Sequence, residues 1–558
     1  TNFMISSSSM ADVFHAVEEN QNLSSKQRCD QCSAIRRICT LLNTKPEHLP
    51  AQGKALSKIL GAIHPTQHNI KLKTWRNIKS NILAAIRSLP KQKRFTNNDR
   101  LNSNWSVLYN ILPTERYKYG LSRFMRYCSY MGVMPLAVDD TTIDDFLVAL
   151  ETNTLLTDKH RHDAHRRTTL LWNEVSVVIT IWPNNKLTIP NYKKPRTTRP
   201  FCDFPKSFQE DVDNYLNWLA DPDPFAEHHP PKRCRPRTIE LRQKQIQLMA
   251  SATVAEGIAI TDIKTLSDLL DPDNIKHALS YYLNKKGKDN AFIIGLGATF
   301  MHIARHWLKL DNEKLKTLKE IRRRLGQRPR GMTEKNRDTL RQFESDMSRR
   351  LLLNLPEQLK INATQQRGIK RAITLQLAIT VELLLTAPIR ISNLASLQFE
   401  QHLVKPGGNK DRYHLVLSKQ ETKNRVPLEF LLSDKLTTML DEYRKTVLPE
   451  LASKQCRYLY PGKNGVQKRT TTLAQQIKGT IFKETGLSLT PHQFRHLCAM
   501  FYLEANPGQY ETVRQLLGHT HLKTTTDFYA SMSTREAQRL FDNTIQEERA
   551  RLSDLRER

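Results

Sequence analysis

The stretch Leu489-Thr490-Pro491-His492-Gln493-Phe494-Arg495-His496 is the most informative part of this 558-residue chain. Thr490 is a preferred N-cap residue and Pro491 is favoured at the first helical position, so a helix is predicted to begin here. His492 and Arg495 are then three residues apart on one face of the first turn. An imidazole, a guanidinium and the positive end of the helix dipole converge at one point, which suits a phosphate.

A second informative stretch lies nearer the C-terminus, and it reads Gln515-Leu516-Leu517-Gly518-His519-Thr520-His521-Leu522-Lys523-Thr524-Thr525-Thr526-Asp527-Phe528-Tyr529-Ala530. Gly518 allows a backbone turn before His519. The three threonines can cap a short helix that carries Tyr529. Tyr529 taken alone could also be a core tyrosine, as could Tyr502 or Tyr510.

Two earlier segments supply further cations. Residues 386–394 follow a strongly apolar helix and contain one arginine, Arg390, which alone could be an ordinary ion-pair partner. Two β-prone runs, 413–419 and 424–430, flank a polar turn and predict a hairpin. Lys419 lies where the first run ends, and Lys423 lies in the turn.

In this order, Arg390, Lys419, His492, Arg495, His519 and Tyr529 resemble the active-site series of the tyrosine recombinase family. The segments LTPHQFRH and QLLGHTHLKTTTDFYA look very like the signature of that family. Lys419 lies eight residues before Pro427, as does the β-hairpin lysine of the family, so it is preferred to Lys423. The sequence departs from the family at Asn393, where many members carry an acidic residue that supports the site.

The resemblance implies a reaction that needs neither a cofactor nor a metal. Tyr529 would attack a phosphodiester to leave a 3′-phosphotyrosine and a free 5′ hydroxyl. His492 would act as base or hydrogen-bond partner, Lys419 would protonate the leaving oxygen, and His519 would bond the scissile phosphate. Arg390 and Arg495 can bind the non-bridging oxygens. The sequence contains no Walker-type loop and no clustered acids of the metal-nuclease kind, which agrees.

The composition favours a nucleic-acid ligand. The chain has 86 Lys and Arg against 56 acidic residues, a formal net charge of +30, and such a charge attracts polyanions. The basic residues are spread along the chain, which suits a protein that wraps a duplex. An unusual surface on a soluble protein, or a ribosome-associated factor, is the alternative reading.

The expected fold class is mainly α with a small β-hairpin or sheet, an α+β catalytic domain. The length is too great for one core and predicts about three to four domains. By the resemblance, helical core-binding domains and the catalytic domain would form a C-shaped clamp on DNA. Segment 238–310 loosely resembles 95–190 in layout, which leaves an internal duplication open. The predicted boundaries are a helical accessory region with a candidate arm-site role (1–94), a core-binding-like domain (95–190), a Pro-rich basic linker with a short helix at 208–219 (191–237), a second core-binding-like domain (238–330), the catalytic domain (331–532) and a helical tail (533–558).

Membrane insertion and a disulfide framework are not expected. The most apolar stretch, 372–389, contains Gln376 and Glu382 and predicts a buried core helix. No signal peptide is evident, and the eight cysteines lack a framework spacing, so a cytoplasmic protein with reduced thiols is expected. Association with the nucleoid of a bacterial host is expected with the recombinase resemblance. A zinc site built on the Cys29-x-x-Cys32 pair and the histidines 64 and 68 is the alternative to free thiols, although the gap is too long for a common finger.

The function that follows is site-specific recombination, in which a mobile element is integrated, excised or transposed. The expected partners are double-stranded DNA at element ends or attachment sites, further copies of the chain in a tetrameric synapse, and accessory DNA-bending or element-encoded proteins. A type IB topoisomerase or telomere resolvase would share the chemistry. A catalytically silent DNA-binding regulator would share the fold, but the intact series from Arg390 to Tyr529 argues against it. The basic stretch 71–89 is either an accessory DNA-binding arm or a solvated helix face.

Overall fold

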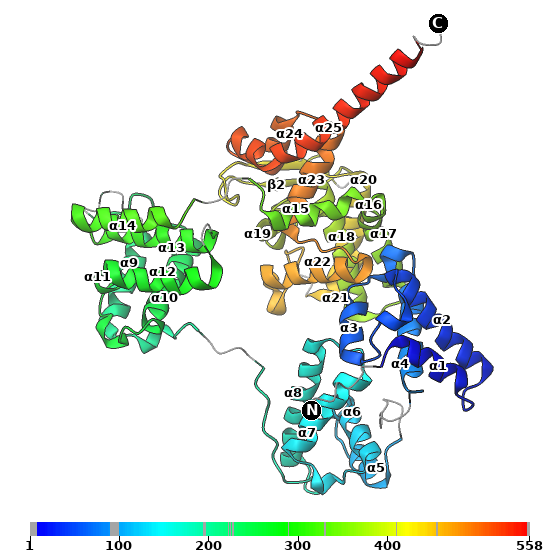
Figure 1. The fold of residues 1–558 in the computed structure, drawn as a ribbon. Coiled ribbons are helices and arrows are strands. Elements are labelled where there is room, and N and C mark those ends of the chain that lie inside the picture. Colours follow the sequence, from blue (N-terminus) through cyan, green and yellow to red (C-terminus); the bar gives the residue numbers. More distant parts are fainter. Residues whose placement is uncertain are drawn as a thin grey trace. The chain divides into compact units, whose positions relative to one another are not determined.

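The computed structural model describes residues 8–89, 100–192, 197–220, 223, 225, 228–287, 290–327, 331–408, 410–452 and 456–554. These residues form mainly helices, together with one three-stranded antiparallel sheet of order β1-β2-β3 (Figure 1). The predicted fold class, mainly α with a small sheet, is confirmed. The chain divides into two compact units, of which the first contains Thr1–Tyr192, Lys335–Leu522 and Arg539–Arg558 and the second contains Lys193–Glu334 and Lys523–Gln538.

The N-terminal part of the first unit packs four helices around one apolar core. Capping boxes at Ser9 and Ser24 start the first two helices, because each serine side chain accepts from a backbone N–H that the helix leaves free. The basic stretch 71–89 forms the fourth helix, and it buries Trp75 and Ile82 in this core. Its apolar face is therefore structural, and its basic residues cover the outside. The helices are α1 (Met10–Glu19), α2 (Ser25–Leu42), α3 (Gly53–Gly61) and α4 (Leu72–Ile86).

The next part of the first unit has an aromatic core of its own. Trp105, Phe124 and Trp172 are fully buried and lie edge-on or tilted to one another at centroid distances of 6.0 to 6.3 Å. Gly132 ends the second helix in the left-handed conformation, at the position where the sequence predicts a stop. The helices are α5 (Ser103–Asn110), α6 (Glu115–Met131), α7 (Asp140–Asn153) and α8 (Asp158–Val178).

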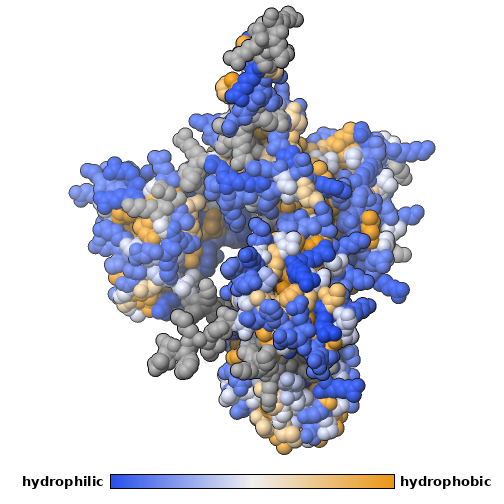
Figure 2. All heavy atoms as spheres, turned by 45° about the vertical axis from the view of Figure 1, so that its right-hand side comes forward, coloured by the Kyte–Doolittle hydropathy of each residue, from blue (hydrophilic) through white to orange (hydrophobic). Residues whose placement is uncertain are grey.

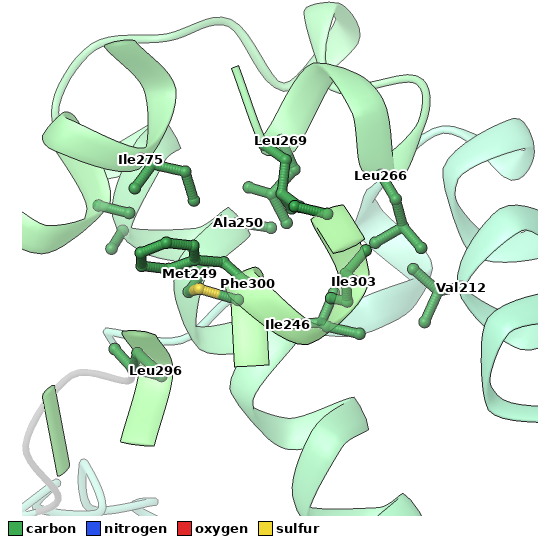
Figure 3. Packing of buried hydrophobic residues seen from close by; sticks show 14 of the residues in the cluster. Val212, Ile246, Met249, Ala250, Leu266, Leu269, Ile275, Leu296, Phe300 and Ile303 are labelled. Atoms are coloured by element: carbon green, nitrogen blue, oxygen red, sulfur yellow. The ribbon is translucent and has the colours of Figure 1, made fainter. Parts of the chain in front are cut away.

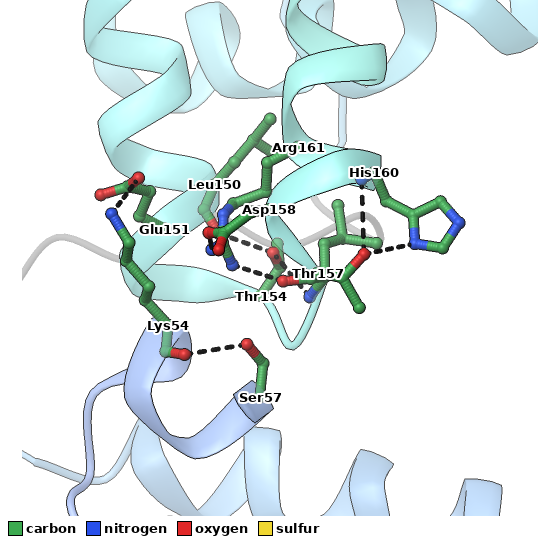
Figure 4. Close-up of polar contacts among 10 residues, drawn as sticks. Lys54, Ser57, Leu150, Glu151, Thr154, Thr157, Asp158, His160 and Arg161 are labelled. Atoms are coloured by element: carbon green, nitrogen blue, oxygen red, sulfur yellow. Dashed lines mark hydrogen bonds and ion pairs between the residues drawn. The ribbon is translucent and has the colours of Figure 1, made fainter. Parts of the chain in front are cut away.

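One ion pair ties these two helical parts of the first unit together, and further polar contacts fix the start of α8. Lys54 of α3 pairs with Glu151 of α7 at 2.7 Å (Figure 4). At the start of α8, the buried Arg161 donates to the carbonyl oxygen of Leu156 and to the carboxylate of Asp158. These bonds satisfy a guanidinium that would be costly to bury alone.

The second unit is a separate helical domain with an apolar core (Figure 3). The helix that the sequence places within a linker, at 208–219, is α9 and belongs to this core through Phe208, Val212 and Tyr215, all fully buried. Flanking prolines interrupt the local pattern, but they do not prevent the apolar face of α9 from docking. The helices are α9 (Lys206–Ala220), α10 (Pro236–Ala255), α11 (Leu266–Leu269), α12 (Pro272–Lys286), α13 (Ala291–His302), a π-helical turn (Ile303–Trp307) and α14 (Asn312–Arg324).

The remaining helices and the sheet belong to the segment that contains most of the predicted site residues. Its central helix α18 (Gly368–Thr386) is buried along most of its length, as predicted, and its Gln376 donates to the Tyr443 hydroxyl at 2.6 Å. The other elements before the sheet are α15 (Glu334–Arg341), α16 (Asp346–Leu353), α17 (Leu355–Thr364) and α19 (Ile391–Ala395). After it come α20 (Asp434–Glu442), α21 (Leu448–Leu451), α22 (Thr470–Thr485), α23 (Pro491–Ala505), α24 (Tyr510–Leu517) and α25 (Leu522–Asp554).

The predicted hairpin is present with shorter strands. β2 (His414–Leu417) pairs with β3 (Leu428–Leu431), with Leu417 opposite Leu428, so the turn is longer than the sequence indicates. A further strand, β1 (Leu403–Val404), pairs with β2 and was not predicted. Two residues are too few to carry an alternating pattern.

One long helix replaces the predicted short helix and separate tail. α25 extends over 33 residues without a break, because no glycine or proline occurs between 522 and 554. The three threonines lie inside its first turns and not before them. The predicted boundary near residue 533 is therefore not a break in secondary structure.

One face of the molecule is mostly polar (Figure 2). Figure 2 shows a face that is mostly hydrophilic, with apolar residues scattered over it. In the described part of the chain, none of the helices combines the length and the hydropathy that crossing a membrane demands. The stretch predicted to be a core helix, α18, accordingly packs inside the protein.

We predict that Phe300→Ala destabilises the second unit by about 3–5 kcal/mol, because Phe300 is fully buried in its core. Scanning calorimetry of the full chain should show one transition move to lower temperature while another stays in place. The matched control is Leu241→Ala on α10, whose side chain is 55% exposed and whose truncation should change little. A uniform shift of all transitions would show that the two units unfold as one.

Candidate active site

Helix α23 begins where the sequence predicts. Thr490 is the N-cap and Pro491 the first helical residue. The side chain of Gln493 reaches back, and its Oε1 accepts from the Thr490 backbone N–H at 2.9 Å. Thr490 and Gln493 thus form a capping box, in which the side chain of each bonds to the backbone N–H of the other. The capping box fixes the first turn, from which His492 and Arg495 project.

Arg495 joins three separate segments. Its side chain is 3% exposed, and its Nη1 donates to the Pro388 carbonyl at 2.6 Å while its Nη2 donates to the Leu517 carbonyl at 2.5 Å. Pro388 lies between α18 and α19, and Leu517 is the last residue of α24. The guanidinium thus holds the loop before Arg390 and the turn before His519 against the start of α23.

Arg390 lies at the N-cap position of α19 and is half-buried, and this burial lowers its pKa. Three residues on, Asn393 is buried and donates from Nδ2 to the backbone carbonyl of Glu421 at 3.0 Å. An ionised carboxylate at position 393 could only accept hydrogen bonds and would face that carbonyl unfavourably. The departure from the family pattern at Asn393 therefore fits its local partner.

Burial and the charges of Arg495 and Arg390 lower the pKa values of two of the predicted histidines, His492 and His519. Burial, Arg495, Arg390 and Lys423 lower the pKa of His492. Burial, Arg495, Arg390 and Arg514 lower the pKa of His519 to about 4. Both imidazoles are therefore neutral at pH 7, and each can donate or accept one hydrogen bond. The structure brings Arg390, His492, Arg495 and His519 together.

The sequence alone assigned no role to His496. Its ring lies edge-on to that of His492 with the centroids 5.1 Å apart, and its side chain is 6% exposed. Burial, followed by His492, Arg495 and His519, lowers its pKa to about 3. The available signal was its position four residues after His492, on the same helix face.

The two hairpin lysines lie in the turn between β2 and β3, and both are exposed. Lys419 is two residues beyond the end of β2. Lys423 is the lysine whose charge contributes to the lowered pKa of His492. The sequence preferred Lys419, and the structure adds Lys423 as a cation of this site.

Gly518 ends α24 in the left-handed conformation, with φ +58°. A Cβ atom there would meet the Leu428 side chain at 3.0 Å, and the Gly518 carbonyl accepts from Asn424 Nδ2 at 2.7 Å. Glycine is required both for the backbone and for this close approach. His519 follows directly, so a backbone turn precedes it, as the sequence predicts.

Tyr529 lies on α25, in the segment Lys523–Gln538 that belongs to the second unit. Its side chain is fully buried, and its ring centroid is 6.4 Å from that of Phe528. It therefore belongs to a different unit of the chain from Arg390, His492, Arg495 and His519. Its role as nucleophile stays a prediction.

Metal-binding residues do not cluster in the described segments, where no group of three or more His, Cys, Asp or Glu side chains could hold an ion. Cys32 packs in the N-terminal core and Cys29 is exposed. His64 is engaged elsewhere, with its Nε2 3.2 Å from the Lys483 carbonyl in the same unit. The four residues proposed as an alternative zinc site thus have separate surroundings.

Comparison with known proteins gives one family match and several distant structures. The Phage integrase family model matches residues 354–536. No curated protein matches the chain. Among solved structures, XerA recombinase is 17% identical over 59% of this chain and 98% of its own, with a TM-score of 0.26. Lambda integrase bound to DNA is 14% identical over 57% and 96%, with a TM-score of 0.35. The integrase of the Tn1549 transposon, in complex with circular intermediate DNA, is 14% identical over 55% and 94%, with a TM-score of 0.30.

The family match contains every candidate residue, from Arg390 to Tyr529. Within it lie the capped start of α23, the buried Arg495 and the hairpin that carries the lysines. Residues 354–536 therefore form a domain of the Phage integrase family.

Proposed function

We propose that this protein cleaves and rejoins DNA at specific sites through a 3′-phosphotyrosine at Tyr529, and so integrates, excises or transposes a mobile element. The observation that carries the proposal is the convergence of Arg390, Arg495 and the neutral His519 in the first unit. Cations and a neutral donor at one point form an anion site suited to a phosphodiester.

The arginines would supply the charge that the reaction needs. A phosphorane carries more negative charge on its non-bridging oxygens than the diester does, so fixed cations stabilise it preferentially. Arg495 is already held by two carbonyl oxygens, and little reorganisation is needed when the phosphate arrives. His519 and His492, neutral at pH 7, can bond the phosphate or take the phenol proton.

Tyrosine requires this help because a free phenol has a pKa of about 10, so forming phenolate at pH 7 costs about 4 kcal/mol. In the proposed step the Tyr529 oxygen bonds to phosphorus and its proton passes to His492. The P–O5′ bond breaks, and a hairpin lysine gives its proton to the 5′ oxygen. The ester retains the bond energy, so a free 5′ hydroxyl can reverse the step.

A fully buried phenol cannot attack, so the proposal requires the start of α25 to repack when DNA binds. The helical parts at 100–192 and 197–327 are proposed as DNA-binding domains of the clamp. The region 1–94 is proposed as an accessory contact. Double-stranded DNA at element ends, a tetramer of this chain on paired sites, and accessory proteins are the proposed partners, and the +30 net charge favours the first.

Tyr529→Phe should abolish covalent attachment while leaving DNA binding intact, because only the nucleophilic oxygen is removed. Nicked suicide duplexes of the element ends, run on a denaturing gel, report the attachment. Tyr502→Phe and Tyr510→Phe are the matched controls and should retain the band. Absence of any band with the wild-type protein would refute the proposal, and relaxation of plasmids without site preference would indicate a topoisomerase.

The pH profile of cleavage should lack the decline near pH 6.5 of an ordinary histidine. The pKa of His492 is lowered and that of His519 is about 4, so the neutral forms are present above those values and are lost only as the pH falls through them. The acid-side decline in cleavage at subsaturating DNA should be centred below pH 6.5. A decline centred at or above 6.5 would contradict a neutral His492.

Lys419→Ala should slow cleavage of ordinary DNA by about 10²–10⁴-fold if Lys419 is the proton donor. A substrate with sulfur in place of the bridging 5′ oxygen should restore the rate, because a thiolate leaves without a proton. Lys423→Ala is the matched variant and should show neither the large loss nor the rescue. The opposite pattern would assign the proton transfer to Lys423.

A further inference from the structure

The turn that carries both candidate lysines is held by its own carboxylate. Oε2 of Glu421 accepts from the Ser418 backbone N–H at 2.9 Å and from the Ser418 hydroxyl at 2.6 Å. These bonds close residues 418–421 into a compact loop directly after β2. Lys419 lies inside that loop and Lys423 lies two residues after it.

The second oxygen of Glu421 is held by a buried histidine. His402 is 2% exposed, and its Nδ1 accepts from the Gln398 backbone N–H at 3.0 Å. A backbone N–H can only donate, so a neutral His402 must carry its proton on Nε2. That Nε2 lies 2.7 Å from Glu421 Oε1 and donates to it. Gln401 adds a weaker bond to the same oxygen, at 3.3 Å.

Two further bonds connect the turn to the candidate active site. Asn393, three residues after Arg390, donates to the Glu421 carbonyl at 3.0 Å. Asn424 donates to the Gly518 carbonyl at 2.7 Å, immediately before His519. The turn is therefore tied to the segments of Arg390 and His519, two of the three predicted phosphate-binding residues.

Glu421 stays ionised throughout the working pH range. Burial raises its pKa, but hydrogen bonds from Ser418 and His402 outweigh this and bring it to about 2. Both carboxylate oxygens are engaged by these groups. Neither Lys419 nor Lys423 forms an ion pair with a described residue, so the acid of this turn does not neutralise its lysines.

We propose that Glu421, anchored by His402, is a positioning residue that sets the β2–β3 turn so that its lysine reaches the leaving 5′ oxygen. The inference rests on the proposed strand-cleavage function. It adds to the family pattern a buried histidine paired with an exposed carboxylate, at positions to which the sequence alone assigned no role. The pair acts through the lysine and does not contact DNA.

Glu421→Ala tests this through the leaving group. We expect cleavage of ordinary suicide duplexes to slow by about 100-fold, the loss typical of a misplaced catalytic group. With 5′-bridging sulfur the rate should return to within a few-fold of wild type, since no proton donor is required. His402→Ala should show the same pattern, and Glu421→Gln, which keeps one acceptor, should lie between.

The chain offers a matched control on the same hairpin. His414 Nδ1 and Glu429 Oε1 are 2.9 Å apart across β2 and β3, in an exposed pair away from the turn. Glu429→Gln should cleave both substrates at the wild-type rate. The comparison separates the loss of a particular carboxylate from the loss of any histidine–carboxylate pair.

The results distinguish failure of the positioning role of Glu421 from failure of the proposed strand-cleavage function. A Glu421→Ala protein that cleaves ordinary DNA normally, or one whose defect persists equally with the sulfur substrate, overturns the positioning role. Thermal unfolding checks that the variants are folded, and Glu421→Gln replaces Glu421→Ala if the latter is not. If the wild-type protein forms no covalent product on either substrate, it is the proposed function that fails.

Discussion

The buried guanidinium of Arg495 is the contact on which the candidate site depends. It lies at the start of α23 and donates to carbonyl oxygens of two other segments, those of Pro388 and Leu517. Charged donors make strong bonds to carbonyls in a dry interior, and breaking one there leaves a costly orphan. The loop before Arg390 and the turn before His519 therefore keep their places as long as Arg495 does.

Carbonyl dipoles satisfy the hydrogen bonds of a guanidinium without cancelling its charge. The positive potential that remains affects the neighbouring histidines: after burial, Arg495 and Arg390 further lower the pKa values of His492 and His519. A phosphate would supply the missing negative charge. Cations that repel one another in the free protein would thus attract a bound phosphate.

The β2–β3 hairpin adds flexible lysine side chains to the segments that Arg495 holds in place. Lysine is long and flexible, so its usefulness as a proton donor depends on where its backbone is held. Here three sets of hydrogen bonds, made by Glu421, Asn393 and Asn424, hold that backbone. Asn393 takes part because an amide can donate to a carbonyl where a carboxylate cannot.

Local signals determined much of this protein in advance. The Thr490-Pro491 start of α23, the buried helix α18, the hairpin and the turn at Gly518 could all be predicted, since caps, apolar runs and left-handed turns act within a few residues. The linker helix that joined a core and the short strand β1 could not be predicted, because distant packing decided them. The continuity of α25 had a local signal, the absence of glycine and proline from 522 to 554, that the prediction of a short helix and a separate tail did not use.

The order of Arg390, Lys419, His492, Arg495, His519 and Tyr529 along the chain was enough to identify the family. Tertiary structure alone decided how Arg390, His492, Arg495 and His519 come together. Arg495 donates to the Pro388 carbonyl, 107 residues away in the chain. The histidines are neutral because of burial and of nearby cations, and no local sequence pattern determines either. Burial of Tyr529 is likewise a property of packing. The physical reason is that sequence encodes local geometry within a turn or two, whereas desolvation and Coulomb interaction depend on what long-range folding brings near.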